Sequence, residues 1–132
     1  MPIQHHNPAT VFALPIYTQM VTVTDMTMIY LTGQVAWDRT GTVIGEGDLR
    51  TQAVQAFENI QALLAAVNAD FTHVVKLTTY IKDFQPEHRA IFVDVLGQYI
   101  GDSPPAHTLL GVQLLARPEL LIEIEVIAAI PR

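Results

Sequence analysis

The sequence predicts an α+β fold in which one mixed β-sheet carries two helices on one face. Two observations support this class. Strand-like segments stand near both ends of the chain, and two segments with helical periodicity lie between them, separated by a further strand. The 132 residues show no internal repeat, long linker or low-complexity tract, so we expect a single domain over residues 1–132.

The first strand signals lie in residues 20–24 and 27–37. Valine alternates with threonine in MVTVT, and β-branched and aromatic residues are frequent in TMIYLTGQVAW. The short break between these segments predicts a hairpin. Gly41, Gly45 and Gly47 then favour turns before the first helix.

Asp48 is a suitable N-cap for the first helix, which Asn68 and Asp70 are expected to end. Apolar side chains recur between these residues with the period of a helix. The expected buried face comprises Leu49, Ala53, Ala56, Phe57, Ile60, Leu63 and Val67.

The second half of the chain alternates strands with a second helix. Residues 73–83 have strand periodicity, and Pro86 suits the first turn of a helix that Gly101 ends. Strands are then expected in about residues 106–115 and in residues 120–130. The apolar stripe of this second helix comprises Phe92, Val95, Leu96 and Tyr99.

Two helices can cover only one face of such a sheet. The last strand is apolar at nearly every position, and the first strands carry large apolar side chains on both faces. Another copy of the chain is the simplest cover for the remaining face. We therefore expect an obligate homo-oligomer.

Composition argues against several classes of protein. The net charge is −6 with only seven lysines and arginines, so nucleic-acid binding is disfavoured. We expect no membrane span and no secretory signal, since no apolar run reaches about 18 residues and the start lacks a basic segment. The absence of cysteine excludes thiolate chemistry and fits a cytoplasmic location.

Two carboxylates stand out in the last strand. Glu123 and Glu125 share one strand face, opposite Ile122, Ile124 and Val126. A buried carboxylate is costly unless it is paired. For Glu125 we favour a solvent-facing or ion-paired position. For Glu123 the pattern is equally compatible with two alternatives: a solvent-facing or ion-paired position, or a position in a cleft where the carboxylate acts as general base.

The histidines and one glycine are the other candidates. His107 alone is more typical of a structural side chain than of a catalytic one. His5 and His6 lie in a terminus expected to be mobile and have no third ligand at suitable spacing. No metal or cofactor is therefore expected. Gly33 interrupts a strand, which suggests a bulge or a close approach of the backbone to a ligand.

Four segments together resemble the reactive intermediate deaminase family, also called Rid or YjgF. They are IYTQMV, YLTGQV, HVVKLTTYIKD and YIGDSPPAHTLLGVQLLARPELLIEIEVIA, and the match is essentially full length. The resemblance implies a chorismate-mutase-like fold and a homotrimer with a central β-barrel and clefts between subunits. For deaminating members it implies cofactor-free hydrolysis of small enamines or imines to a ketoacid and ammonia.

The resemblance also assigns residues to the cleft. Tyr17 stands at the position of the cleft tyrosine, and Thr32 replaces the usual serine beside Gly33. Glu123 matches the glutamate that positions the attacking water.

Three positions depart from the family pattern. His107 occupies the place of the arginine that clamps the substrate carboxylate, and Val93 falls where many members have asparagine. Leu109 stands where cysteine is common, so only its backbone is expected to contribute. Losing one charge-assisted contact costs about 1.5–3 kcal/mol, or roughly ten- to hundredfold in affinity.

We therefore expect a hydrolase or deaminase acting on a small imine, enamine or related carbonyl compound. Glu123 would hold the water, and His107 would orient or protonate the substrate while facing Glu123. The alternative is a protein of the same fold that binds a metabolite or partner without turnover. Ribonuclease activity, which is attributed to some relatives, is disfavoured by the acidic charge.

Overall fold

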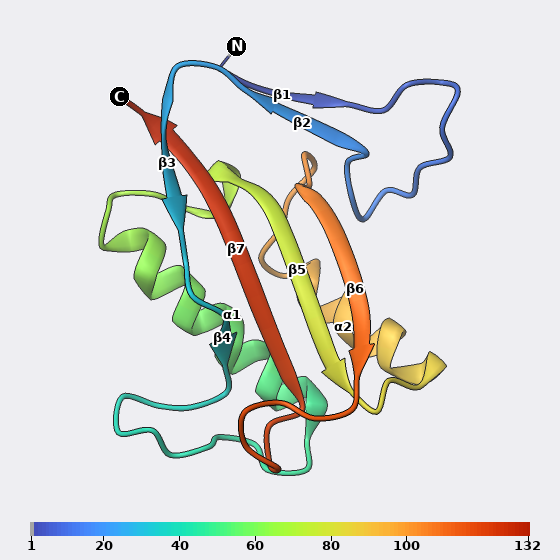
Figure 1. The fold of residues 1–132 in the computed structure, drawn as a ribbon, viewed down its shortest axis with the longest axis vertical. Coiled ribbons are helices and arrows are strands. Elements are labelled where there is room, and N and C mark those ends of the chain that lie inside the picture. Colours follow the sequence, from blue (N-terminus) through green and yellow to red (C-terminus); the bar gives the residue numbers. More distant parts are fainter. Residues whose placement is uncertain (1) are drawn as a thin grey trace.

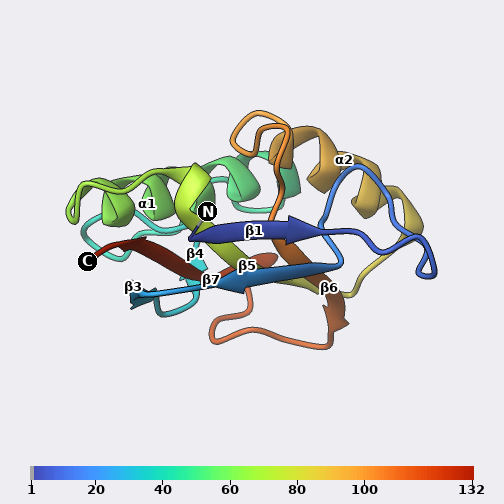
Figure 2. The ribbon, with the colours of Figure 1, turned by 90° about the horizontal axis from the view of Figure 1, so that it is seen from above.

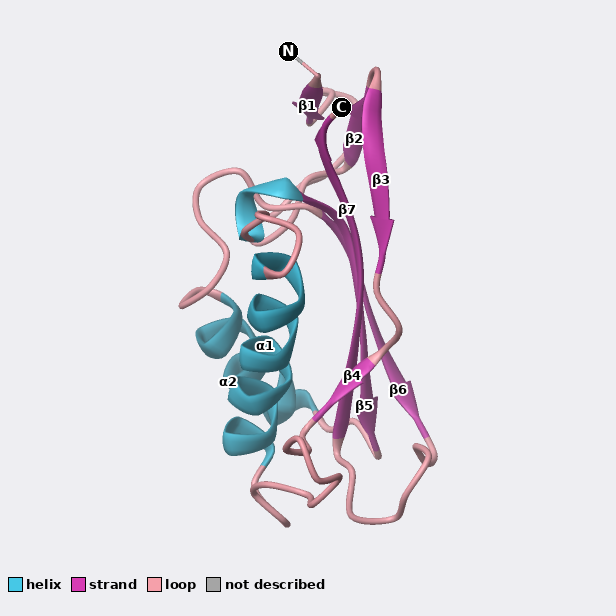
Figure 3. Ribbon diagram, turned by 90° about the vertical axis from the view of Figure 1, so that its left-hand side faces the viewer, coloured by secondary structure: helices cyan, strands magenta, loops and turns pink. Residues whose placement is uncertain are grey.

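A computed structural model describes residues 2–132. Figures 1 and 3 show two helices packed on one face of a mixed sheet, which confirms the predicted α+β class. The elements are β1 (Ile3–His6), β2 (Met20–Val23), β3 (Met26–Tyr30), β4 (Gln34–Val35), α1 (Leu49–Ala65), the 3₁₀ helix η1 (Phe71–His73), β5 (Val74–Lys82), α2 (Pro86–Leu96), β6 (Ala106–Val112) and β7 (Ile122–Pro131).

The main sheet has the strand order β3-β7-β5-β6, and β4 also pairs with β7. β5 and β6 are parallel, whereas β7 is antiparallel to β3, β4 and β5. A parallel pair needs a crossover connection, and α2 lies in that connection. β7 is therefore the strand that holds most of the sheet together.

The predicted hairpin between residues 20–24 and 27–37 is wrong. β2 pairs with β1 in a separate two-stranded ribbon, and β3 pairs with β7. Figures 1 and 2 show this ribbon beyond one end of the main sheet. Asp25, between β2 and β3, has a φ of +56°, which redirects the chain. Strand patterning marks both segments but does not choose their partners.

The ribbon also corrects the expectation for the N-terminal histidines. His5 and His6 lie in β1, paired through the backbone with Val21 and Met20. The Nε2 atom of His6 lies 2.9 Å from the Thr22 hydroxyl oxygen. The backbone ladder holds this segment in an ordered strand, so it is not a free tail.

The first helix begins where the sequence predicts. The Asp48 carboxylate accepts a hydrogen bond from the Thr51 N–H at 3.1 Å, as an N-cap should. The predicted buried face of α1 is wrong at the C-terminal end of the helix. Leu64 is fully buried, whereas Leu63 and Val67 are each 42% exposed. α1 ends at Ala65, so Val67 lies beyond the helix and does not follow its periodicity.

The second helix also begins as predicted, at Pro86, but ends at Leu96 rather than near Gly101. Phe92, Val95 and Leu96 are buried, as expected from the apolar stripe. In the chain from residue 2 to 132, no helix has the length and apolar character that a membrane span requires.

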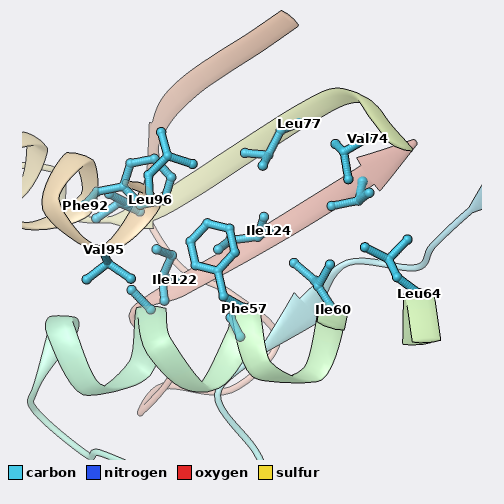
Figure 4. Close-up of a cluster of buried hydrophobic side chains, with 14 of the residues drawn as sticks. Phe57, Ile60, Leu64, Val74, Leu77, Phe92, Val95, Leu96, Ile122 and Ile124 are labelled. Carbon is cyan, nitrogen blue, oxygen red and sulfur yellow. The ribbon is translucent and has the colours of Figure 1, made fainter. Parts of the chain in front are cut away.

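The hydrophobic core fills the layer between the helices and the sheet (Figure 4). Phe57 and Leu64 of α1 and Phe92 of α2 face Leu77 of β5 and Ile124 of β7. All five side chains are fully buried. Each such burial stabilises the fold by about 1.5–3 kcal/mol, so this layer supplies the main driving force for folding.

The second face of the sheet lies away from both helices (Figure 3). It exposes large apolar side chains: Tyr30 is 74% exposed, Leu110 44% and Met28 38%. Glu123 and Glu125 share this face, since they pair across the ladder with Tyr80 and Thr78. The need for a cover remains, and the homo-oligomer that would provide it stays a prediction.

Two adjacent leucines provide a test of the helix packing. Leu64→Ala should lower the free energy of unfolding by about 2–5 kcal/mol, because it leaves a cavity in the core. Leu63→Ala should change it by less than about 1 kcal/mol, because that side chain is largely exposed. Urea denaturation of both variants measures this difference. Equal losses would show that the buried face of α1 is assigned incorrectly.

Candidate active site

His107 lies on β6 with its side chain toward the helices. It pairs in the parallel ladder with Leu77, which is buried in the core, and its ring lies 5.5 Å from the ring of Phe92. The Nε2 atom of His107 is 3.1 Å from the hydroxyl oxygen of Thr79. Thr79 is fully buried, so this contact satisfies a polar group that would otherwise be costly. His107 therefore has a structural role within its own chain.

Burial, together with the smaller effect of the positive charge of Lys76, lowers the pKa of His107 to about 4. The imidazole is thus neutral at pH 7. It offers one ring nitrogen beyond the Thr79 contact, and it carries no charge with which to hold an anion.

The loop between β1 and β2 is fastened to the residues that precede β6. The N–H of Thr18 donates to the carbonyl of Pro105 at 3.0 Å, and its hydroxyl donates to the carbonyl of Pro104. These bonds bring Tyr17 to the same cavity as His107. Residues 90 positions apart in the sequence, Tyr17 and His107, are thereby held at one cavity.

The resulting α2–β6 cavity has a volume of about 190 Å³. It is lined by Leu14, Ile16, Tyr17, Arg89, Phe92, Val93, His107 and Leu109. Most of these side chains are apolar, as in many small-molecule sites. The structure therefore brings Tyr17, His107 and Leu109 together, as the sequence analysis grouped them. Leu109 lines the cavity as well, and the expectation that only its backbone takes part stays a prediction.

Leu14, Ile16 and Arg89 line the cavity without having been predicted from the sequence, and Arg89 is the charged residue among them. It stands four residues before Val93 on α2, so the two side chains lie on the same helix face. Because the family resemblance places Val93 at a cleft position, the four-residue spacing is the sequence signal that points to Arg89.

Glu123 lies on the opposite face of the sheet. It pairs in the ladder with Tyr80, while its neighbours Ile122 and Ile124 are buried against the helices. Partial burial raises the pKa of Glu123, and the negative charge of Glu125 raises it further. Glu125 is exposed and accepts a hydrogen bond from the Tyr80 hydroxyl at 3.2 Å, in agreement with its expected solvent-facing position.

Gly33 provides the space that the Glu123 carboxylate occupies. A Cβ atom at position 33 would lie 2.1 Å from Oε2 of Glu123, which is far inside contact distance. The predicted close approach at this glycine is thus made by a side chain of the same chain. Thr32 beside it is exposed, and its carbonyl accepts a hydrogen bond from the Gln34 amide at 3.0 Å.

The predicted residues therefore form two separate groups. Tyr17, His107 and Leu109 line the α2–β6 cavity, whereas Gly33 and Glu123 meet on the open face of the sheet. Within one chain His107 does not face Glu123, because the sheet lies between the two side chains. Any reaction that uses both residues requires a second copy of the chain.

A larger cavity, of about 440 Å³, lies near Asp70, Tyr99 and Asp102 and contains none of the predicted site residues. Asp70 is already engaged as the cap of η1, where it binds the N–H of Thr72. Among residues 2–132, no cluster of three or more histidine, aspartate or glutamate side chains is arranged to hold a metal ion.

Comparison with known proteins gives consistent matches over most of the chain. The model of the endoribonuclease L-PSP family matches residues 9–130. Protein DfrA of Myxococcus xanthus is 34% identical over 93% of this chain and 92% of its own. A 2-iminobutanoate/2-iminopropanoate deaminase of Bos taurus is 37% identical over 85% of this chain and 78% of its own.

Solved structures agree with these relatives. The crystal structure of YyfB from Yersinia pestis, a Rid-family protein described as of unknown function, has a TM-score of 0.93 and 34% identity. It matches over 98% of this chain and 100% of YyfB.

The buried imidazole makes a prediction about stability and pH. The pKa of His107 is about 4 in the folded chain and about 6.5 when unfolded, so only the unfolded state gains this proton between those values. The free energy of unfolding should therefore fall as pH drops from about 6.5 to 4. His107→Gln should reduce this fall by about 1–3 kcal/mol, as measured by urea denaturation across that range. Parallel pH profiles for the two proteins would contradict the burial of a neutral imidazole.

Proposed function

The chain belongs to the endoribonuclease L-PSP family, which includes the Rid and YjgF proteins, and on this premise we propose that it is a cofactor-independent deaminase of small imines or enamines. The observation that carries the proposal is the Glu123 carboxylate, which lies over Gly33 and has a raised pKa. A carboxylate of this kind accepts a proton from water more readily than an ordinary one. The deaminase activity of the bovine relative, 37% identical, supports the same reaction class.

The proposed reaction needs one water molecule and no other reagent. Glu123 takes a proton from the water as the water oxygen bonds to the imine carbon, and it passes that proton to the imine nitrogen, which gives a carbinolamine. The proton of the carbinolamine hydroxyl is then transferred through Glu123 to the nitrogen as the C–N bond breaks, so that ammonia leaves and the carbonyl forms. An enamine substrate reaches the same path after tautomerising to the imine. The net change is imine plus water to ketoacid plus ammonia.

The proposal includes a homotrimer with the reaction clefts between subunits. Glu123 and His107 lie on opposite faces of the sheet in one chain, so a shared cleft needs His107 from one copy and Glu123 from another. The exposed apolar side chains Tyr30 and Leu110 support an interface on the Glu123 face. The family resemblance supplies the trimer and the central barrel formed by the sheets.

The proposed partners are a small-molecule substrate and further copies of the chain. The α2–β6 cavity of about 190 Å³ suits a short-chain metabolite. The net charge of −6 does not favour a polyanion such as RNA. A second candidate is a metabolite-binding protein without turnover, which the neutral His107 in place of an arginine favours.

Two adjacent glutamates on the same strand face test the catalytic proposal. Glu123→Gln should lower kcat for the hydrolysis of 2-iminopropanoate, generated in situ from 2-aminoacrylate, by roughly 10²–10⁴-fold. The matched control Glu125→Gln should keep kcat within about threefold, since that side chain is exposed. Stopped-flow absorbance measures both rates. Absence of wild-type acceleration over buffer between pH 6 and 8 would leave the binding protein as the surviving candidate.

Gly33 provides an independent test of the same carboxylate. Gly33→Ala places a methyl group where the carboxylate lies, so Glu123 must move and kcat should fall at least about tenfold. The free energy of unfolding should change by less than about 1 kcal/mol, because the atom displaced is the end of a flexible side chain. Kinetics and urea denaturation of the same preparation separate the two effects. An unchanged kcat would argue against the proposed position of the carboxylate.

A further inference from the structure

We propose that Arg89 binds the carboxylate group of the substrate at the mouth of the α2–β6 cavity, in place of residue 107. This inference rests on the proposed function and deepens it by naming the residue that selects anionic substrates. Arg89 lines the cavity together with Tyr17 and His107. The family resemblance implies an arginine where His107 stands, and this chain has its cavity arginine at position 89.

The charges of the lining residues support this assignment. Arg89 is the permanent cation among the eight residues that surround the cavity. His107 is neutral at pH 7 because of its burial, and its Nε2 atom is already engaged with Thr79. Within one chain, a ligand carboxylate that enters this cavity therefore meets a guanidinium at Arg89.

The position of Arg89 on α2 suits this role. Arg89, Phe92 and Val93 lie on the helix face that lines the cavity. Arg89 is exposed, so its guanidinium lies in contact with solvent and an incoming anion can reach it. A planar guanidinium can hold a carboxylate with two parallel hydrogen bonds.

Arg89 is also free of protein carboxylates. In the described part of the chain, residues 2–132, three other arginines form ion pairs: Arg50 with Asp94, Arg117 with Glu119 and Arg132 with Asp25. Arg89 takes part in none of the ion pairs or side-chain hydrogen bonds found in this part of the chain. A ligand would therefore not have to displace an existing partner.

The remaining walls define the substrate class. Leu14, Ile16, Phe92 and Leu109 are apolar and lie beside the single cation. A ligand that matches them has one carboxylate and a short hydrocarbon chain. The short-chain 2-imino acids of the proposed function have both features, so the apolar walls can hold their alkyl part while Arg89 binds the carboxylate.

Titration calorimetry with 2-oxobutanoate and with its uncharged amide tests the inference. Arg89→Gln should weaken binding of the acid by roughly ten- to hundredfold and leave the amide unchanged, because only the acid loses a charge-assisted contact. The affinity of Arg89→Lys for the acid should lie between those of the wild type and Arg89→Gln, since a lysine supplies charge without the planar guanidinium. Arg39→Gln is the matched control: Arg39 is also exposed, but it lies near Trp37, away from this cavity, and its loss should not alter binding.

The outcomes separate this inference from the proposed function. If the wild type hydrolyses 2-iminopropanoate and Arg89→Gln keeps both kcat/KM and the affinity for 2-oxobutanoate, the role of Arg89 is refuted and the deaminase stands. If 2-oxobutanoate binds in an Arg89-dependent manner and the wild type shows no turnover, the carboxylate site stands and the deaminase is refuted. The carboxylate site is refuted if the wild type does not bind 2-oxobutanoate. It is also refuted if Arg89→Gln weakens the binding of the acid and of the amide equally.

Discussion

The alternation of side chains along β7 is the constraint on which this structure depends. Ile122, Ile124 and Val126 are buried against the two helices, and the residues between them, Glu123 and Glu125, necessarily face the other way. The same strand pairs with β3, β4 and β5, so it holds the sheet together while it presents a carboxylate on the open face. Moving Glu123 to the helix side would bury the charge in the core and expose an isoleucine. Core packing thus fixes the face on which water could be activated.

The cavity on the helix side depends on a second set of constraints. The hydrogen bonds of Thr18 to the carbonyls of Pro104 and Pro105 bring the N-terminal loop against the start of β6. His107, two residues after Pro105, lies within hydrogen-bond distance of the buried hydroxyl of Thr79. His107 therefore has two roles: it stabilises the cavity wall, and it also lines the cavity. These contacts fit a neutral histidine, whose ring packs beside Phe92 while one ring nitrogen lies within hydrogen-bond distance of Thr79.

The separation of the two groups of residues links the fold to the proposed chemistry. One face of the sheet carries the carboxylate that we propose as the base, and the other carries the cavity in which we place the substrate. A second copy of the chain could bring these surfaces together and would also cover apolar side chains such as Tyr30 and Leu110. Assembly, catalysis and substrate choice would then depend on one interface. The guanidinium of Arg89 would select acids at the cavity mouth, since the imidazole of His107 carries no charge at neutral pH.

The sequence by itself determined the α+β class, the starts of both helices at Asp48 and Pro86, and the opposite faces of Glu123 and Ile124. These features follow from short-range periodicity and capping, which each segment carries within itself. The family resemblance added Tyr17, Thr32 and Leu109 to the candidate site and placed His107 in the cleft. Only the tertiary structure decided that β2 pairs with β1, that Leu64 is buried in place of Leu63, and that Arg89 shares a cavity with His107. Strand partners and cavities arise from contacts between residues far apart in the chain, and no local pattern encodes those contacts.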